Sequence, residues 1–185
     1  MRIVAGDWRG RPLIAPTGLG TRPTADRVRQ ALFDMLLHAP WGGRHVIEGA
    51  RVLDAFAGTG ALGLEALSRG AAHATFMERD PAALSALRAN VTALGAGARC
   101  TILAADALRP PGGAPCGLIF LDPPYGEDMV PRAVDALAHA GWIAPRGLLV
   151  AEIGRAEAIP NMGEPLAERA HGAARLVIWR ATVSA

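Results

Sequence analysis

Residues 117–126 read Gly117-Leu118-Ile119-Phe120-Leu121-Asp122-Pro123-Pro124-Tyr125-Gly126. A run of four apolar residues is typical of a buried strand in a parallel sheet, and the two prolines that follow cannot donate a ladder hydrogen bond. We therefore expect the strand to end at Asp122. In an open α/β sheet, ligands bind beyond the carboxyl ends of the strands, so this acid and the loop after it are predicted to enter a binding crevice.

The loop after this strand combines three kinds of group. Pro123 and Pro124 stiffen it and leave backbone carbonyls unpaired, and Tyr125 adds a flat ring. Oxygen acceptors beside a ring suit a planar base with an exocyclic amine, because the oxygens accept its N–H groups while the ring stacks. The pattern resembles the [Asp/Asn/Ser]-Pro-Pro-aromatic signature of S-adenosylmethionine-dependent amino-group methyltransferases. Its candidate catalytic residues are Asp122, Pro123 and Tyr125, and the structural alternative is a Pro-Pro turn that only closes a strand.

A second pattern lies earlier in the chain, and it reads Val52-Leu53-Asp54-Ala55-Phe56-Ala57-Gly58-Thr59-Gly60-Ala61-Leu62-Gly63. Its three glycines match G-x-G-x-x-G between a strand and a helix, with the acid Glu78 further on. Taken alone, this arrangement is a nicotinamide dinucleotide fingerprint. However, the glycines begin four residues after Asp54, and an acid at that place would repel a pyrophosphate.

The acids favour S-adenosylmethionine, whose ammonium and sulfonium are cationic. Asp54 is expected to hold the methionine end, Glu78 the ribose hydroxyls, and Asp106 the adenine amino group, since each ends a predicted strand. The glycine backbone approaches a ligand closely because no Cβ intervenes. The candidate cofactor-binding residues are Asp54, Phe56, Gly58, Gly60, Glu78, Arg79, Asp106 and Ala107.

From residue 51 the chain alternates strand and helix, which predicts a parallel, doubly wound α/β sheet. Strands are expected over 51–55, 74–78, 98–104, 117–121 and 148–153, and helices over 61–69, 81–94 and 129–139. Residues 166–170 and 175–183 read as a terminal antiparallel hairpin, which a plain dinucleotide domain lacks.

The N-terminal part is expected to form a small β-hairpin, turning at Gly10, and an amphipathic helix over 25–38 with Thr24 as its N-cap. Residues 1–51 hold eight Arg and four acids, against eleven and thirteen in the remainder. This basic part predicts contact with a polyanion, although a solvated surface explains the charge as well. The candidate RNA-binding residues are Arg2, Trp8, Arg9, Arg11, Arg22, Arg27 and Arg29.

Composition limits the other function classes. The 185 residues suit one domain, no apolar run approaches the ~20 residues of a membrane span, and the N-terminus does not read as a signal peptide. We therefore expect a soluble, cytoplasmic protein. Cys100 and Cys116 are expected to be buried thiols, and neither they nor the five His form a ligand pattern, so no metal is expected.

Five segments together resemble the RsmD-type guanine-N2 methyltransferases of bacterial small-subunit ribosomal RNA. They are residues 2–11, 22–29, 53–60, 78–80 and 122–125. The first two are the specific ones, and family members often carry Phe where Tyr125 stands. The resemblance implies a Rossmann-like class I methyltransferase with a seven-stranded, mostly parallel sheet and a C-terminal antiparallel hairpin over residues 46–185. It also implies an RNA-contacting extension over residues 1–45, and 16S ribosomal RNA or the 30S subunit as partner. A monomer is the default expectation.

Under this hypothesis the Asp122 carboxylate and the Pro123 carbonyl hold both hydrogens of the guanine amine, which aims its lone pair at the methyl group. Three alternatives remain. A DNA adenine or cytosine amino methyltransferase shares the loop but normally carries extra sequence to read its site. A protein glutamine methyltransferase usually has Asn in place of Asp122. A non-catalytic ribosome-assembly factor would not need the four acids.

Overall fold

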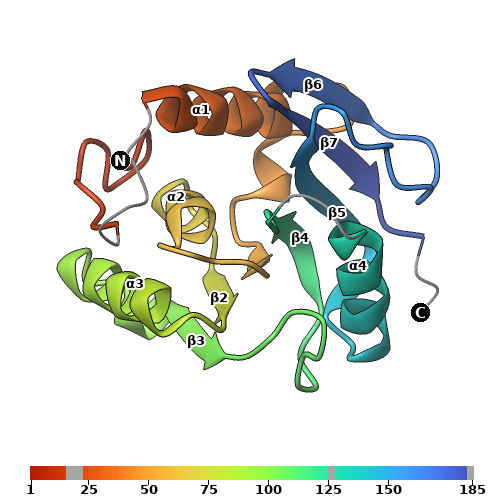
Figure 1. The fold of residues 1–185 in the computed structure, drawn as a ribbon. Helices are drawn as coiled ribbons and strands as arrows, with labels where there is room; N and C mark the ends of the chain where they lie inside the picture. The colour runs from red at the N-terminus through yellow and green to blue at the C-terminus, as the bar shows by residue number, and fades with distance from the viewer. Residues whose placement is uncertain (16–22, 125–127, 183–185) are drawn as a thin grey trace.

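The computed structural model describes residues 1–15, 23–124 and 128–182. In this part of the chain, seven strands form one sheet in the order β3-β2-β1-β4-β5-β7-β6 (Figure 1). The strands are β1 (Arg51–Asp54), β2 (His73–Glu78), β3 (Cys100–Ala104), β4 (Cys116–Leu121), β5 (Ile143–Gly154), β6 (Ala167–His171) and β7 (Ala174–Arg180). The helices are α1 (Pro23–His38), α2 (Ala61–Ser68), α3 (Pro81–Ala93) and α4 (Met129–His139), with short 3-10 turns η1 (Arg44–Val46) and η2 (Gly97–Arg99).

The predicted fold class is confirmed. Strands β1 to β5 pair in parallel, and β5, β7 and β6 pair antiparallel, so the chain ends in the expected hairpin. Most predicted boundaries agree with the structure to within three residues, and two differences bear on the predictions. Strand β5 begins at Ile143, before the apolar run, and α1 begins at Pro23, so Thr24 lies inside the helix and the prediction that it caps the helix is wrong.

The strand order reverses between β1 and β4, which places a crevice at their carboxyl ends. Helices α2 and α3 carry the chain outward from β1 to β3, and α4 carries it the other way, from β4 to β5. Right-handed crossovers require helices that run in opposite directions to cover opposite faces. The two hydrophobic clusters agree, because one includes Leu64 and Leu87 from α2 and α3, and the other includes Val130 and Leu137 from α4.

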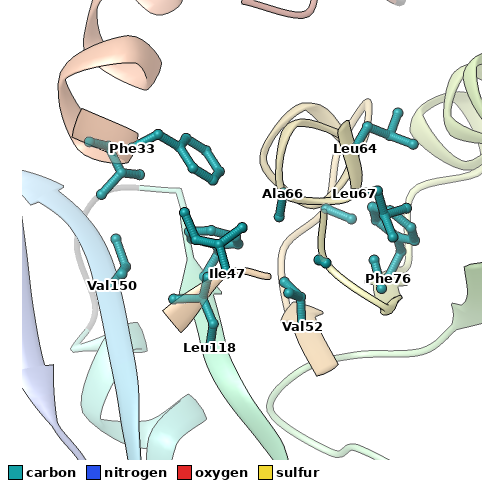
Figure 2. Close-up of a cluster of buried hydrophobic side chains, with 14 of the residues drawn as sticks. Phe33, Ile47, Val52, Leu64, Ala66, Leu67, Phe76, Leu118 and Val150 are labelled. Carbon is teal, nitrogen blue, oxygen red and sulfur yellow. The ribbon is translucent and has the colours of Figure 1, made fainter. Parts of the chain in front are cut away.

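Alternate residues of each strand serve the two faces, as the pleat demands. Val52, Leu118 and Val150 point to the face covered by α2 and α3, where Figure 2 shows them with Phe33 of α1. Their neighbours along the strands, such as Leu53 and Ile119, belong to the cluster under α4. Helix α1 therefore joins the same layer as α2 and α3.

The N-terminal segment packs into this layer. Ile3 and Leu13 are buried in the cluster of Val52 and Phe33, and Gly10 takes the expected positive φ of 82°. The predicted hairpin is short, with one antiparallel bridge between Arg2 and Pro12. Backbone hydrogen bonds across it run from the Ile3 N–H to the Arg11 carbonyl, from the Leu13 N–H to the Met1 carbonyl and from the Gly10 N–H to the Ile3 carbonyl.

Candidate active site

The three glycines after β1 differ in what they do. Gly58 and Gly60 have positive φ values of 52° and 80°, which favour glycine. A Cβ at Gly58 would meet nothing within 4 Å, so its backbone is open to the crevice. A Cβ at Gly63 would lie 2.4 Å from the Phe76 ring, so this glycine allows α2 to pack closely on β2.

Asp54 is the last residue of β1 and is 2% exposed. Its Oδ2 accepts a hydrogen bond of 2.9 Å from the Gly63 N–H in the first turn of α2. Burial raises the pKa of Asp54 to about 7, against the lowering effect of that hydrogen bond and with a smaller contribution from the Glu78 carboxylate. A cation beside Asp54 would therefore be strongly favoured, because it would restore the ionised form.

Glu78 ends β2 and organises the glycine loop from the next strand. Its carboxylate accepts the Gly58 N–H at 2.8 Å and the N–H groups of Arg79 and Asp80 at 2.7 Å each. Since a carboxylate offers about four lone-pair sites, Glu78 keeps capacity for one further donor. The acid thus fixes the position of the loop that lines the crevice.

Asp106 follows β3 and forms an ion pair with Arg79, with Nη1 and Oδ2 2.9 Å apart. The Leu108 N–H, which donates to Asp106 at 2.9 Å, is the main cause that holds the pKa of Asp106 below its ordinary value, and the Arg79 guanidinium adds to it. Arg79 and Asp106, both predicted to bind the cofactor, therefore form an ion pair with each other.

Asp122 directly follows β4, as the sequence predicted, and Pro123 after it is buried. Asp122 is exposed as a residue and lines the cavity, where neighbouring protein atoms reduce the hydration of its carboxylate. This loss of hydration, followed by the negative charges of Glu152 and Asp54, raises the pKa of Asp122 to about 7. The third predicted catalytic residue, Tyr125, lies outside the described residues.

One cavity of about 1050 Å³ brings most of these residues together. The predicted residues that line it are Asp54, Phe56, Gly58, Glu78, Arg79, Asp106, Ala107, Asp122 and Pro123. Gly60, the left-handed N-cap residue of α2, is not among the lining residues. The cavity is larger than the predicted site, and the lining residues that sequence reasoning missed include Met1, Val28, Leu32, Val150, Glu152, His171 and Leu176.

The candidate RNA-binding residues fall into different environments. Arg9 and Arg27 are exposed, and Arg2 is exposed but lies 3.7 Å from Asp26. The Arg11 guanidinium donates to the Ala93 carbonyl at 2.6 Å. Arg22 lies outside the described residues.

Trp8 does not form the open stacking edge that the sequence suggested. It is half-buried against the core, and the Arg99 guanidinium covers its ring at 4.9 Å from the centroid. The two residues form a cation–π pair on the surface.

Arg29 differs most from its prediction, because it is 4% exposed and its guanidinium is fully engaged inside the protein. It donates to Glu65 at 3.3 Å, to Asp26 at 2.9 Å and to the Arg2 carbonyl. A guanidinium buried in this way is not available to RNA phosphates. The sequence pattern places Arg29 outside the apolar stripe of α1, but it does not show that this polar side chain is buried.

Its partner Glu65 is the organising residue that the sequence did not reveal. Glu65 is fully buried in α2 and also accepts the Val4 and Ala5 N–H groups at 2.8 and 2.9 Å and Arg69 Nε at 2.8 Å. One carboxylate thus joins the N-terminal segment, α1 and α2. The only signal for it in the sequence was an acid inside an otherwise apolar helix.

These features define a class I methyltransferase fold, the fold of S-adenosylmethionine-dependent enzymes. They are the strand order of the sheet, the glycine loop after β1 and the acids at the ends of β1, β2, β3 and β4. Among the described residues no helix is long and apolar enough to cross a membrane. In the same part of the chain, no three His, Cys, Asp or Glu side chains gather as ligands for a metal ion.

Comparison with known proteins defines the family. The model of the family named conserved hypothetical protein 95 matches residues 1–180, and the chain belongs to this family, which is the RsmD family. Ribosomal RNA small subunit methyltransferase D of Escherichia coli K12 is 44% identical over 153 residues, which cover 82% of this chain and 74% of the relative. The resemblance seen in the sequence is therefore confirmed.

Solved structures agree with this assignment. A putative methyltransferase from Escherichia coli, yhhF, superposes with a TM-score of 0.84 at 35% identity, covering 100% of this chain and 99% of the other. The 16S rRNA N2 G1207 methyltransferase RsmC of T. thermophilus, solved with AdoMet and guanosine, superposes with a TM-score of 0.64 at 18% identity. That superposition covers 89% of this chain and 44% of RsmC, and it shows a shared fold.

Proposed function

We propose that the protein methylates the exocyclic N2 amine of a guanine in small-subunit (16S) ribosomal RNA, with S-adenosylmethionine as methyl donor. The observation that carries the proposal is one cavity that Asp122 and Pro123 line together with Gly58 of the glycine loop and the acids at the ends of β1, β2 and β3. The names of the relatives support small-subunit ribosomal RNA as the substrate. The acceptor groups of the loop support an exocyclic amine as the methylated group.

The residues present fit the cofactor by the chemistry of their donors. Asp54 offers a poorly hydrated carboxylate that a cationic methionine end would stabilise, and the open backbone at Gly58 admits a close ligand. Glu78 has capacity for a ribose hydroxyl, and Asp106 for an adenine amine. Phe56 and Ala107 supply apolar wall. When bound, S-adenosylmethionine supplies an electrophilic methyl group on a sulfonium.

Asp122 and Pro123 supply the acceptor side of the reaction. The guanine amine is a weak nucleophile because its lone pair is delocalised into the ring. If the Asp122 carboxylate and the Pro123 carbonyl accept its two N–H groups, the nitrogen is held pyramidal with its lone pair directed along one line. With its raised pKa, Asp122 is also a better proton acceptor than an ordinary carboxylate. Tyr125 is proposed to stack on the unstacked base.

The exposed residues of the basic N-terminal part, Arg2, Arg9 and Arg27, are proposed to contact RNA phosphates. We keep the division into an extension over residues 1–45 and a methyltransferase domain over 46–185 as a functional one, since both pack into a common core. The proposal also includes a monomer that acts in the cytoplasm on 16S RNA or on the assembled 30S subunit.

The substrate class is tested by incubating the protein and methyl-labelled S-adenosylmethionine with unmodified small subunits, their naked RNA and duplex DNA. We expect label in the ribosomal samples and none in DNA. Label in DNA would favour the DNA amino methyltransferase alternative. Absence of label in all three, together with absence of S-adenosylmethionine binding in calorimetry, would favour a non-catalytic assembly factor.

A further inference from the structure

The cavity continues beyond the predicted cofactor residues into a second part between α1 and the C-terminal strands. Val28 and Leu32 of α1 line one side, and Val150 of β5 and Leu176 of β7 line another. These apolar walls suit the faces of a planar ring. The carboxylate of Glu152, from β5, also belongs to the lining of this part of the cavity.

Glu152 is placed beside Asp122 by the strand register. Phe120 pairs with Val150 and Leu121 with Ala151 in the parallel β4–β5 ladder, so Asp122 and Glu152 are the next two residues in line. Because side chains alternate, both continue the face of Phe120 and Val150, which is the face of α1. The effect of Glu152 on the titration of Asp122 agrees with this proximity.

Within the protein, one neighbour of Glu152 is His171 at the end of β6. His171 Nε2 lies 3.7 Å from Glu152 Oε2, which is an ion-pair distance and not a hydrogen-bond distance. The same Nε2 is buried and has no hydrogen-bond partner in the described part of the chain. Asp122 and Glu152 both line the cavity, so a ring that enters it meets two neighbouring carboxylates. A carboxylate offers about four lone-pair sites, so Glu152 can accept a donor from a ligand in addition to its contacts within the protein.

The bases that carry an exocyclic amine differ at the ring nitrogen next to it. In guanine this position, N1, carries a hydrogen and donates, whereas adenine N1 and cytosine N3 are acceptors. A carboxylate only accepts, so it attracts guanine and repels the other two at this position. A second carboxylate beside the amine site is therefore a means of selecting guanine.

We propose that Glu152 accepts the N1–H of the target guanine while Asp122 takes the adjacent amine, so that Glu152 is the residue that restricts the enzyme to guanine. This inference rests on the proposed function. It assigns to β5 a direct contact with the substrate that no loop motif indicates.

The test uses 2-aminopurine, which keeps the C2 amine but has an acceptor at N1. Ribosomal RNA is assembled with guanine or with 2-aminopurine at the methylated position, once mass spectrometry has located it, and kcat/KM is measured for both. We expect the wild-type protein to prefer guanine by at least about 100-fold. Glu152→Gln should lose about 10- to 100-fold on guanine, because a charged acceptor is replaced. It should lose little on 2-aminopurine, because its amide donates to N1.

Two variants separate this role from a structural one. Glu168→Gln changes a carboxylate on β6 that pairs with Arg175 at 2.9 Å outside the cavity, and His171→Ala removes the neighbour of Glu152. Both should keep the wild-type preference ratio. An equal loss on the two bases in Glu152→Gln, or the same collapse of the ratio in His171→Ala, would overturn the inference. If the wild-type protein methylates no guanine at all, the proposed function fails first.

Discussion

Asp122 stands where β4 gives way to two prolines, with its side chain in the cavity rather than in the cofactor loop. We predict that Asp122→Ala keeps the affinity for S-adenosylmethionine within a few-fold but lowers kcat by at least about 100-fold, because an acceptor that positions the amine is lost. Calorimetry and single-turnover transfer measure the two quantities. Equal loss of both would place Asp122 in the cofactor site instead.

Asp54 links the site to folding stability. Its pKa in the folded protein is raised from 3.8 to about 7. The folded state therefore holds the proton more tightly than the unfolded state, and stability is lost as pH rises from 3.8 through 7. Asp54→Asn, which still accepts the Gly63 N–H, should raise the unfolding free energy at pH 8 by at most about 4 kcal/mol.

The matching measurement is denaturant unfolding at pH 8 and at pH 4, where the gain should nearly vanish. In the same variant, S-adenosylmethionine affinity at pH 8 should fall, since the amide no longer balances a cation. A stabilisation that is equal at both pH values would show that the effect arises from packing and not from the charge of Asp54.

At the level of elements, Glu65 of α2 holds the N-terminal segment and α1 in place. Glu65→Ala removes the buried carboxylate that Arg29 and Arg69 share, so we predict a loss of about 3–5 kcal/mol in unfolding free energy. The exposed pair Arg44–Glu48 is the control, and Glu48→Ala should cost no more than about 1 kcal/mol.

Hydrogen exchange distinguishes this account from general destabilisation. From wild type to Glu65→Gln, the exchange rates of the Val4 and Ala5 amides should increase more than those of the β1 amides, because these two N–H groups donate to the carboxylate. Uniform loss of protection over the whole chain would contradict a local role for Glu65.

The contact between α2 and β2 depends on Gly63. A Cβ there would overlap the fully buried Phe76 ring at 2.4 Å, so Gly63→Ala is expected to cost about 1–3 kcal/mol. Gly117 in β4 is a matched control, because a Cβ there meets nothing within 4 Å and Ala should be neutral or slightly stabilising. Thermal unfolding of the two variants gives the comparison, and equal melting temperatures would refute the packing argument.

Most elements could be predicted from the sequence because their signals are local. The apolar run before Asp122 and the glycines after Asp54 carry their own strand and turn preferences, and both patterns lie where they were expected. Strand β5 was predicted too short, because its first residue, Ile143, lies before the apolar run and pairs with Cys116 of β4.

Across the whole molecule, sequence reasoning failed where a residue's environment is set by distant partners. Arg29 looked solvent-exposed on α1 but meets Glu65, 36 positions away. Glu152 was missed because no motif surrounds it, although an acid near the end of an apolar strand is the same signal that pointed to Asp54 and Asp122. The N-terminal segment was expected to be an RNA-contacting extension, and its burial was not predicted: Ile3 lies in the main core.

At the centre of the proposed function, the cavity presents one atom of one base, the N2 of guanine, for methylation. The direct measurement is to methylate unmodified small subunits with a trideuteromethyl donor, digest the RNA to nucleosides and separate the products by mass spectrometry against standards. We predict N2-methylguanosine with the deuterium label, absent when Asp122→Ala is used. Label in 1-methylguanosine, 7-methylguanosine or a methylated adenosine would contradict the role assigned to Asp122 and Pro123.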